Sequence, residues 1–406
     1  MKKTAPVFLA FLAMGFADVA GPLVSLAQQT FALSTFMAEL LPFSGFLFFG
    51  LLSVPMGVLQ DRKGKKYLLV LGLSVALAGL LIPIVSGLYG PKPVIAPGAV
   101  GQFYVVMASI LLLGAGAAIL QVVGNPVMRD VSPPGAYSRN LSLAQGVKAV
   151  GSSLGFLLPP LALAYLGLDW PLLFPVYAAL SALALLACLP LELHEAKDPA
   201  SAPATLGSCL ALLAQNRFVL LMSAGIFVYV GAEVCLSSGV PLLLKNVFGI
   251  GSFGLWISWT LFFLPIMLGR FAGALILRRM RPALFLALTS ALSIAGLLLL
   301  IAGPRDAAFL GSVLAGLGFA NVFPLIFSIT VDAYPAQSNE ISGLMITAIV
   351  GGAIIPPLMG LLADAAGSVR WGFLTPLAAF AYIAWLAAAN LRAEAAPEAP
   401  AEPALP

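Results

Sequence analysis

Two oppositely charged side chains lie inside long apolar segments, where an unpaired charge has a high free-energy cost. Asp18 lies in the apolar run 5–30 and Lys148 in the run 138–167. At about 1.5 Å per residue, a helix places both near the middle of a bilayer. A charge there costs at least a few kcal/mol, and an opposite charge within about 4–6 Å allows both groups to stay charged. We therefore expect the two to face each other, as an ion-binding site or, alternatively, as a purely structural link.

Amide side chains at similar depth form a second group of candidates. Gln121 and Asn125 lie four residues apart and so share one face of a helix, and Gln145 and Lys148 share a face of the run 138–167. Amides both donate and accept hydrogen bonds, which suits a ligand rich in hydroxyls, such as a sugar. The alternative for each amide is a hydrogen bond between helices, which is common in membranes.

Polar residues in the second half of the chain complete the candidate set. Glu233 shares a helical face with Tyr229, and we expect both to line a cavity as ligand- or ion-binding groups; the alternative is a helix–helix hydrogen bond. Asn321 is a single amide for which ligand contact and a structural role are equally open. Trp259 is a candidate to stack on the apolar face of a sugar, whereas Glu39, near the start of its run, is expected to be solvated.

The composition determines which elements must position these residues. Of the 406 residues, 61% are hydrophobic and 9% are charged, which is outside the range of soluble domains. The apolar runs are mostly long enough to cross a bilayer as helices, and the alternation expected of an outer-membrane barrel is absent. We expect an all-α, polytopic membrane protein with twelve transmembrane helices: 5–30, 34–60, 67–88, 99–128, 138–167, 170–190, 217–248, 251–277, 282–303, 307–333, 338–365 and 371–391.

The distribution of cations predicts how these helices are oriented. Most Lys and Arg residues fall in alternate loops, and only Lys92, Lys245, Arg305 and Arg370 fall in the others. Because cytoplasmic loops carry the excess of cations, we expect a protein of the inner membrane with both termini in the cytoplasm. The net charge of +4 follows this sorting and does not imply nucleic acid. Cleavage of the first segment as a signal peptide is the alternative, but its apolar run is too long and contains Asp18.

The chain divides into two halves of six expected helices each. We assign residues 1–190 to an N-terminal bundle, 191–216 to a cytoplasmic linker, 217–392 to a C-terminal bundle and 393–406 to a disordered tail. Short segments repeat between the halves: Leu158-Pro-Pro-Leu161 is echoed by Ile355-Pro-Pro-Leu358, and Gly114-Ala-Gly by Gly316-Leu-Gly. These repeats predict two pseudo-symmetric bundles with a binding site between them.

The loop between the second and third runs carries a specific motif. It reads Gly57-Val-Leu-Gln-Asp61-Arg62-Lys-Gly64-Lys-Lys66, and it resembles the corresponding loop of the major facilitator superfamily of transporters. The resemblance implies that Gly57, Asp61, Arg62 and Gly64 form a cytoplasmic gate motif. In it, Asp61 accepts hydrogen bonds from the amino end of a neighbouring helix, and Gly57 allows that helix to approach closely.

Further segments resemble one family within this superfamily. They are Gly124-Asn-Pro126, Phe227-Val-Tyr-Val-Gly-Ala-Glu233-Val, Phe323-Pro-Leu-Ile-Phe-Ser328 and Gly351-Gly-Ala-Ile-Ile-Pro-Pro-Leu-Met-Gly360. Together these segments look like the fucose–proton symporter family, which includes glucose/galactose permeases. The resemblance implies a symporter with one acid in the first span, matched by Asp18, and another in the fourth. Gln121 stands where that family has the second acid, and Lys148 stands where its fucose symporters have an asparagine.

We therefore expect a secondary transporter that imports a hexose or deoxyhexose by proton symport through alternating access. Sodium coupling, or an acidic sugar or organic anion bound by Lys148, remains open. The chain has a single histidine and its three cysteines have no paired spacing, so we expect no enzyme activity, metal or disulfide. A nucleotide-binding Gly-x-x-x-x-Gly-Lys-Ser/Thr segment is absent. We expect no cofactor beyond the coupling ion, and a monomer in the lipid bilayer.

Overall fold

The computed structural model describes residues 4–89, 99–131, 137–193, 205–251, 254–277, 279–334 and 338–395. These residues form helices joined by short turns, and none of them lies in a β-strand. Eleven of the described segments are long and apolar enough to cross a membrane. The all-helical, polytopic character expected from the composition is therefore confirmed.

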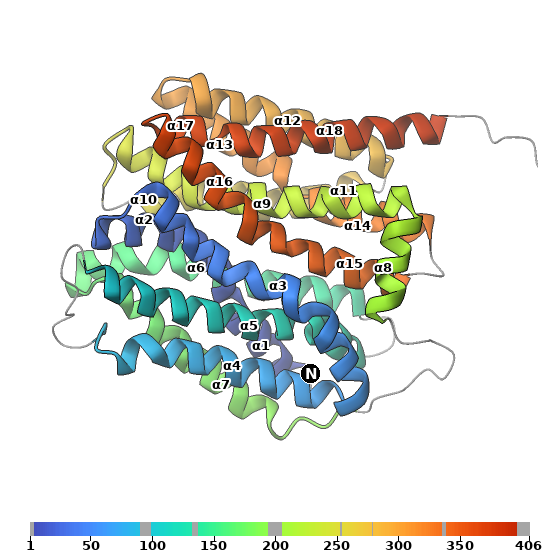
Figure 1. Ribbon diagram of the computed structural model, residues 1–406, viewed down its shortest axis with the longest axis horizontal. Helices are drawn as coiled ribbons and strands as arrows, with labels where there is room; N and C mark the ends of the chain where they lie inside the picture. The colour runs from blue at the N-terminus through green and yellow to red at the C-terminus, as the bar shows by residue number, and fades with distance from the viewer. Residues whose placement is uncertain are drawn as a thin grey trace, which may run out of the picture.

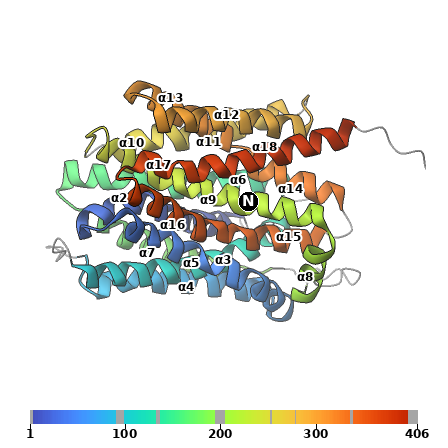
Figure 2. The ribbon, with the colours of Figure 1, turned by 45° about the horizontal axis from the view of Figure 1, so that its top comes forward.

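The helices run roughly along the long axis of the molecule in both views (Figures 1 and 2). The first part of the chain forms α1 (Ala5–Met14), the 3-10 helix η1 (Gly15–Val19), α2 (Ala20–Phe31), α3 (Thr35–Lys63), α4 (Lys65–Val85), α5 (Val100–Val131), α6 (Tyr137–Leu161), the π-helix η2 (Ala162–Leu166), the 3-10 helix η3 (Trp170–Leu172) and α7 (Leu173–Cys188). The helix α8 (Leu206–Gln215) lies in the predicted linker.

The second part of the chain forms the remaining helices. They are α9 (Arg217–Asn246), α10 (Gly254–Ser258), the π-helix η4 (Trp259–Phe263), α11 (Leu264–Ile276), α12 (Pro282–Ala302), α13 (Arg305–Phe319), α14 (Val322–Ala333), α15 (Ser338–Thr347), the 3-10 helix η6 (Ala348–Val350), α16 (Gly351–Ala365), α17 (Val369–Gly372) and α18 (Leu374–Ala395). The α18 helix runs to Ala395, and residues 396–406 lie outside the described part of the chain.

Several predicted spans are interrupted near their middle, which the hydropathy pattern did not indicate. The first span, expected as one helix over 5–30, is broken by η1, and the break leaves α1 only 10 residues long. By itself, α1 is too short to count among the eleven segments of membrane-crossing length. A second break separates α13 from α14 at residues 320–321, and η6 separates α15 from α16. Backbone groups that a break releases must find other partners inside a membrane.

The two parts of the chain meet along α2 and α3. In Figure 1 the helices α1–α7, in blue to green, lie below, and α9–α18, in yellow-green to red, lie above. The α3 helix packs lengthwise against α15, η6 and α16, and α2 packs against α9. Close approach requires glycine at this boundary: a Cβ atom on Gly352 would lie 2.9 Å from the ring of Phe46, and one on Gly50 would lie 2.8 Å from Val350.

The turns before and after α3 mark the two ends of the molecule. The α2–α3 end holds the turn at Ala32–Ser34, where the Ser34 hydroxyl accepts a hydrogen bond from the Met37 N–H at 3.2 Å. The α3–α4 end holds Gly64, whose φ of +88° ends α3. The helix runs through Gly57 to Lys63, three residues beyond the predicted end at residue 60.

Among the described residues, hydrogen bonds between the two parts of the chain lie at the α2–α3 end and the adjoining middle. Here the Trp256 indole N–H donates to the Leu157 carbonyl oxygen at 2.8 Å, and the amide of Asn246 donates to that of Gln28 at 3.3 Å. The carboxylate of Asp364, at the end of α16, accepts from the first backbone N–H groups of α3. These contacts join the two parts of the chain at this end of the molecule.

Candidate functional site

Asp18 and Lys148 form an ion pair, as their burial in apolar runs predicted. The Lys148 Nζ atom lies 3.2 Å from the Asp18 Oδ2 atom, and their side chains are 19% and 33% exposed. The Ser152 hydroxyl, one turn beyond Lys148 on α6, donates to the same Asp18 oxygen at 2.8 Å. Asp18 thus has one ionic and one hydroxyl partner, both from α6, and remains accessible to a small ion or water.

A close helix crossing positions this cluster. A Cβ atom on Gly15 would lie 2.5 Å from the Lys148 carbonyl oxygen and 2.7 Å from the Ser152 nitrogen, and Gly151 is equally close to the backbone of Leu12. The backbones of η1 and α6 therefore touch, which brings Asp18 within reach of both α6 side chains. On the other side of the crossing, the buried Tyr177 hydroxyl of α7 donates to the Gly151 carbonyl oxygen at 2.5 Å.

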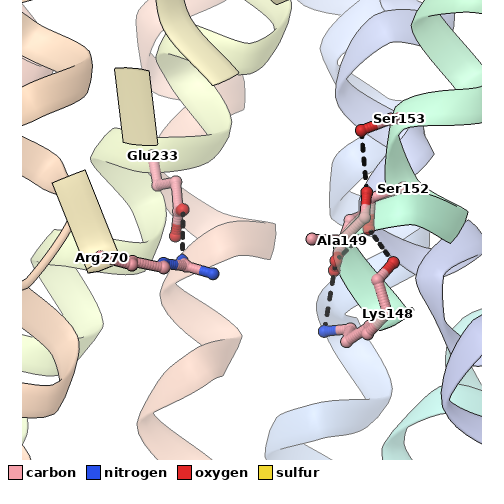
Figure 3. Close-up of polar contacts among 7 residues, drawn as sticks. Lys148, Ala149, Ser152, Ser153, Glu233 and Arg270 are labelled. Atoms are coloured by element: carbon pink, nitrogen blue, oxygen red, sulfur yellow. Dashed lines mark hydrogen bonds and ion pairs between the residues drawn. The ribbon is translucent and has the colours of Figure 1, made fainter. Parts of the chain in front are cut away.

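A second ion pair joins α9 and α11 in the other part of the chain. The Arg270 Nη2 atom lies 3.6 Å from the Glu233 Oε1 atom, and their side chains are 47% and 24% exposed. In Figure 3 this pair lies opposite the α6 residues Lys148 and Ser152. Asp18 and Lys148 are close enough to act electrostatically on Glu233. The two pairs therefore belong to one electrostatic site that both parts of the chain form.

The break between α13 and α14 supports the second pair. A helix that ends releases carbonyl groups from their usual partners. Here the Tyr229 hydroxyl donates to the Phe319 carbonyl oxygen at 3.1 Å, and the Arg270 Nε–H donates to that of Ala320 at 3.4 Å. Tyr229, predicted as a ligand contact, is fully buried in this arrangement and precedes Glu233 by one helical turn.

Asn321 and Trp259 both hydrogen-bond to neighbouring helices. The Asn321 amide is buried, donates to the Gly269 carbonyl oxygen at 2.8 Å and packs directly against Gly273. The Trp259 indole N–H donates across the boundary between the two parts of the chain to the Ser153 hydroxyl at 2.9 Å. Their ligand-binding roles stay predictions, and each side chain already has the interhelical partner that the structural alternative requires.

The other predicted polar residues are only partly described. Gln121 is half-buried on α5, about one turn before Asn125. Asn125 and Gln145 lie on α5 and α6, but their side chains are outside the described part of the structure. Sequence reasoning did not single out the pairing of Arg270 with Glu233. The sequence did indicate that Arg270 needs a partner, because Arg270 is itself a cation inside an apolar run.

The expectation that Glu39 is solvated is wrong. Its side chain is completely buried, and neither carboxyl oxygen has a hydrogen-bond partner among the described residues. The residue lies one turn into α3, and the approach of α9 and α16 covers it. Position near the end of an apolar run does not reveal such covering, which depends on how distant segments pack.

The gate motif lies at the α3–α4 end and is only partly defined. A Cβ atom on Gly57 would meet no described atom within 4 Å, so none of the described helices makes the expected close approach there. Arg62 is exposed, and the Asp61 side chain is outside the described residues. Sequence reasoning missed a contact beside the motif, in which the Lys65 ammonium lies 2.6 Å from the Asp130 carboxylate of α5.

A cavity of about 430 Å³ opens at the α2–α3 end. Its lining includes Gln29, Thr30, Asp169, Trp170 and Lys245, and none of the predicted site residues. Among the described residues, no group of three His, Cys, Asp or Glu side chains is placed to hold a metal ion.

Comparison with known proteins identifies related transporters. The profile of the Major Facilitator Superfamily matches residues 7–349. The chain is 28% identical over 373 residues to a glucose/galactose transporter of Brucella abortus, covering 88% of this chain and 86% of the relative. It is 23% identical over 390 residues to the L-fucose-proton symporter of Escherichia coli (strain K12), covering 88% of this chain and 85% of the relative.

The fold also resembles a solved transporter structure. The crystal structure of the Major Facilitator Superfamily transporter FucP in the outward conformation superposes with a TM-score of 0.66 at 21% identity, covering 95% of this chain and 97% of that chain. These similarities are to transporters and not to enzymes.

Proposed function

The chain belongs to the Major Facilitator Superfamily, and from this premise we propose that it imports a sugar, a hexose or deoxyhexose, together with a proton. The proposal takes its substrate class from the relatives, which are named as glucose/galactose and L-fucose-proton transporters. The observation that carries it is the cluster of Asp18, Lys148 and Ser152 at a break in the first apolar span.

We infer that the protein has twelve spans in two pseudo-symmetric bundles of six. The interrupted α1–η1–α2 segment is the remaining span. Glycine contacts recur between the halves: Gly114 of α5 packs against Gly45 of α3, and Gly316 of α13 packs against Phe262 of η4. Equivalent segments thus use equivalent close contacts, which supports the internal repeat seen in the sequence.

The proposed proton carrier is Asp18. While Lys148 lies beside it, the ammonium stabilises the ionised carboxylate, and the Ser152 hydroxyl does the same by donating a hydrogen bond. Inward opening that moves Asp18 away from Lys148 would remove this stabilisation, so that the carboxyl group takes up a proton. Lys148 therefore sets when Asp18 binds and releases the proton.

The sugar is proposed to bind between the two ion pairs. Gln121, Asn125, Gln145 and Lys148 would contact it from one half, and Tyr229, Glu233, Trp259 and Asn321 from the other. Lys148 and Glu233 are the charged members of this set whose side chains are described, and both are partly exposed between the two halves. Because Lys148 is already paired with Asp18, an anionic substrate would have to displace that carboxylate, which favours a neutral sugar over an acidic one.

We assign the α2–α3 end to the outside and the α3–α4 end, with its cluster of cations, to the cytoplasm. Both termini are then cytoplasmic, the protein lies in the inner membrane as a monomer, and the cavity near Lys245 faces outward. Transport would proceed by alternating access, in which the halves rock about the boundary formed by α2 and α3. Sodium is the less favoured coupling ion, because Lys148 would repel a second cation at Asp18.

Uptake by purified protein in liposomes tests this function. Wild-type protein should accumulate labelled glucose, galactose or fucose under an inward proton gradient. Asp18→Asn should abolish accumulation and leave counterflow exchange measurable, because exchange needs no net proton movement. Accumulation by Asp18→Asn under the same gradient would refute the role of Asp18. Accumulation of sugar by the wild type only in a sodium gradient would establish sodium as the coupling ion.

A further inference from the structure

Glu39 is a buried acid that the proposed coupling mechanism does not use. Its side chain has no exposed surface and no hydrogen-bond partner for either oxygen among the described residues. The Ser238 hydroxyl lies within hydrogen-bonding reach of the Glu39 carboxyl group, and in this arrangement it donates to the carbonyl oxygens of Val234 and Cys235 in its own helix. Burial of an ionised carboxylate away from any cation is very costly, so this arrangement favours the protonated form of Glu39.

Asp364, the neighbouring acid, has the backbone partners that Glu39 lacks. Its Oδ1 and Oδ2 atoms accept hydrogen bonds from the Thr35 and Phe36 backbone N–H groups at 3.0 and 2.8 Å. These donors are the first turn of α3, where the helix dipole also favours a negative charge. Asp364 also acts electrostatically on Glu39. Of the two acids, Asp364 therefore has two backbone donors as partners, whereas Glu39 has none.

Among the described residues, no cation faces Glu39 to stabilise an ionised carboxylate. The groups facing it are Asp364 on α16 and the Ser238 hydroxyl and Cys235 thiol on α9. The α2 helix carries no acid or base, and the titratable group on the outer turns of α5, Tyr104, is exposed. Lys245 lies seven residues beyond Ser238 on α9 and lines the separate cavity.

The covering of Glu39 depends on contact between the two halves. The residue belongs to α3 of the first half, whereas Asp364, Cys235 and Ser238 belong to the second. Where α3 and α16 meet, a Cβ atom on Gly360 would lie 2.8 Å from the Phe36 Cα atom, so the backbones touch at this point. Separation of the halves at this end would expose Glu39 to water and allow it to lose its proton.

We propose that Glu39 is a proton-binding site of the outer gate, and that the gate closes only when a proton from the external solution occupies it. This inference rests on the proposed transport cycle and adds a second acid to it. The site exchanges protons with the outside alone, because closure buries it before the cytoplasmic side opens. Its proton is therefore not transported; it makes outer closure more favourable in acidic surroundings, whereas Asp18 carries the coupled proton.

The test measures gate closure directly, without sugar. Spin labels are attached to cysteines introduced by Ser86→Cys and Asp306→Cys, two exposed positions in different halves at the outer end. The buried Cys188, Cys209 and Cys235 are replaced by alanine so that only these positions react. Distances are then measured in lipid nanodiscs from pH 8 to pH 5. Linkage to one proton changes the closed-to-open ratio by at most about tenfold per pH unit. We expect the wild-type closed population to rise as the pH falls.

The variant Glu39→Gln keeps the shape of the side chain but cannot ionise. It should stay largely closed, with the closed-to-open ratio changing less than about twofold over the same range. Asp169→Asn is the matched control, because it removes an acid at the same end that lines the cavity and does not face Glu39; it should keep the wild-type response. Glu39→Met gives a second neutral variant if Glu39→Gln does not fold.

A wild-type pH response retained in Glu39→Gln, or absent from the wild type itself, overturns the inference. Liposome uptake is measured separately on the same preparations. A gate that responds through Glu39 in a protein that carries no sugar with protons would refute the proposed function and leave the gate site standing. Proton-driven uptake without any effect of Glu39 on the gate would refute the gate site and leave the proposed function standing.

Discussion

Replacement of Gly151 by alanine tests whether the crossing of η1 and α6 sets the geometry of the Asp18–Lys148 pair. The added Cβ atom would collide with the Leu12 carbonyl group, and the Gly15 Cα atom would lie at only 3.3 Å. Both obstacles are backbone, which cannot turn aside as a flexible side chain would. The helices must therefore separate by about 1 Å to restore ordinary contact distances, which stretches the 3.2 Å ion pair.

The matched control is Gly146→Ala, on the same helix, where an added Cβ atom meets nothing within 4 Å. Both substitutions gain about 1 kcal/mol of helix propensity, so this term cancels in their comparison. Overpacking at Gly151 costs about 1–3 kcal/mol, and that is the expected difference in stability between the two variants. We expect Gly146→Ala to match or exceed the wild-type melting temperature and Gly151→Ala to fall below it.

The functional measurement is proton-driven sugar accumulation in liposomes, normalised to the amount of folded protein. Gly151→Ala should lose accumulation more than counterflow exchange, because a displaced Lys148 no longer sets the protonation of Asp18. Equal accumulation and equal melting temperatures in Gly151→Ala and Gly146→Ala would refute the argument that this crossing positions the pair.

Two further substitutions distinguish ligand contacts from helix packing. Gln145→Ala should weaken sugar binding by about 0.5–1.5 kcal/mol for each hydrogen bond lost, as measured by calorimetry on purified protein; unchanged affinity would favour the interhelical alternative. Asn321→Ala removes a buried hydrogen bond to the Gly269 carbonyl oxygen, so it should lower the melting temperature while sugar affinity stays near the wild-type value. A large loss of affinity in a protein of normal stability would instead place Asn321 in the binding site.

The helical architecture could be predicted from the sequence because its cause is local. Long apolar runs must satisfy their backbone groups internally in lipid, so eleven of the expected segments form helices of membrane-crossing length. The interruptions were not predictable in this way. Hydropathy averages over a window, and the apolar residues around η1 and residues 320–321 give the same signal whether the helix continues or breaks.

The central site was predicted in part for a related reason. A lysine and an aspartate inside apolar runs must each be neutralised, so their pairing followed from the cost of burying charge, and the 3.2 Å contact confirms it. The same reasoning applied to Arg270 would have sought an acid for it. It could not have selected Glu233, because the choice depends on how α9 and α11 pack.

The sequence by itself therefore determined which residues enter the membrane and which of them carry a charge that needs a partner. Only the tertiary structure decided which partners meet. Gly15 and Gly151 allow two backbones to touch and so bring Ser152 to Asp18. Glu39 was expected in water and is buried, because α9 and α16, about 200 residues or more further along the chain, cover it. Hydropathy reports the cost of burying a group, whereas packing of distant segments determines whether the group is buried and what it faces.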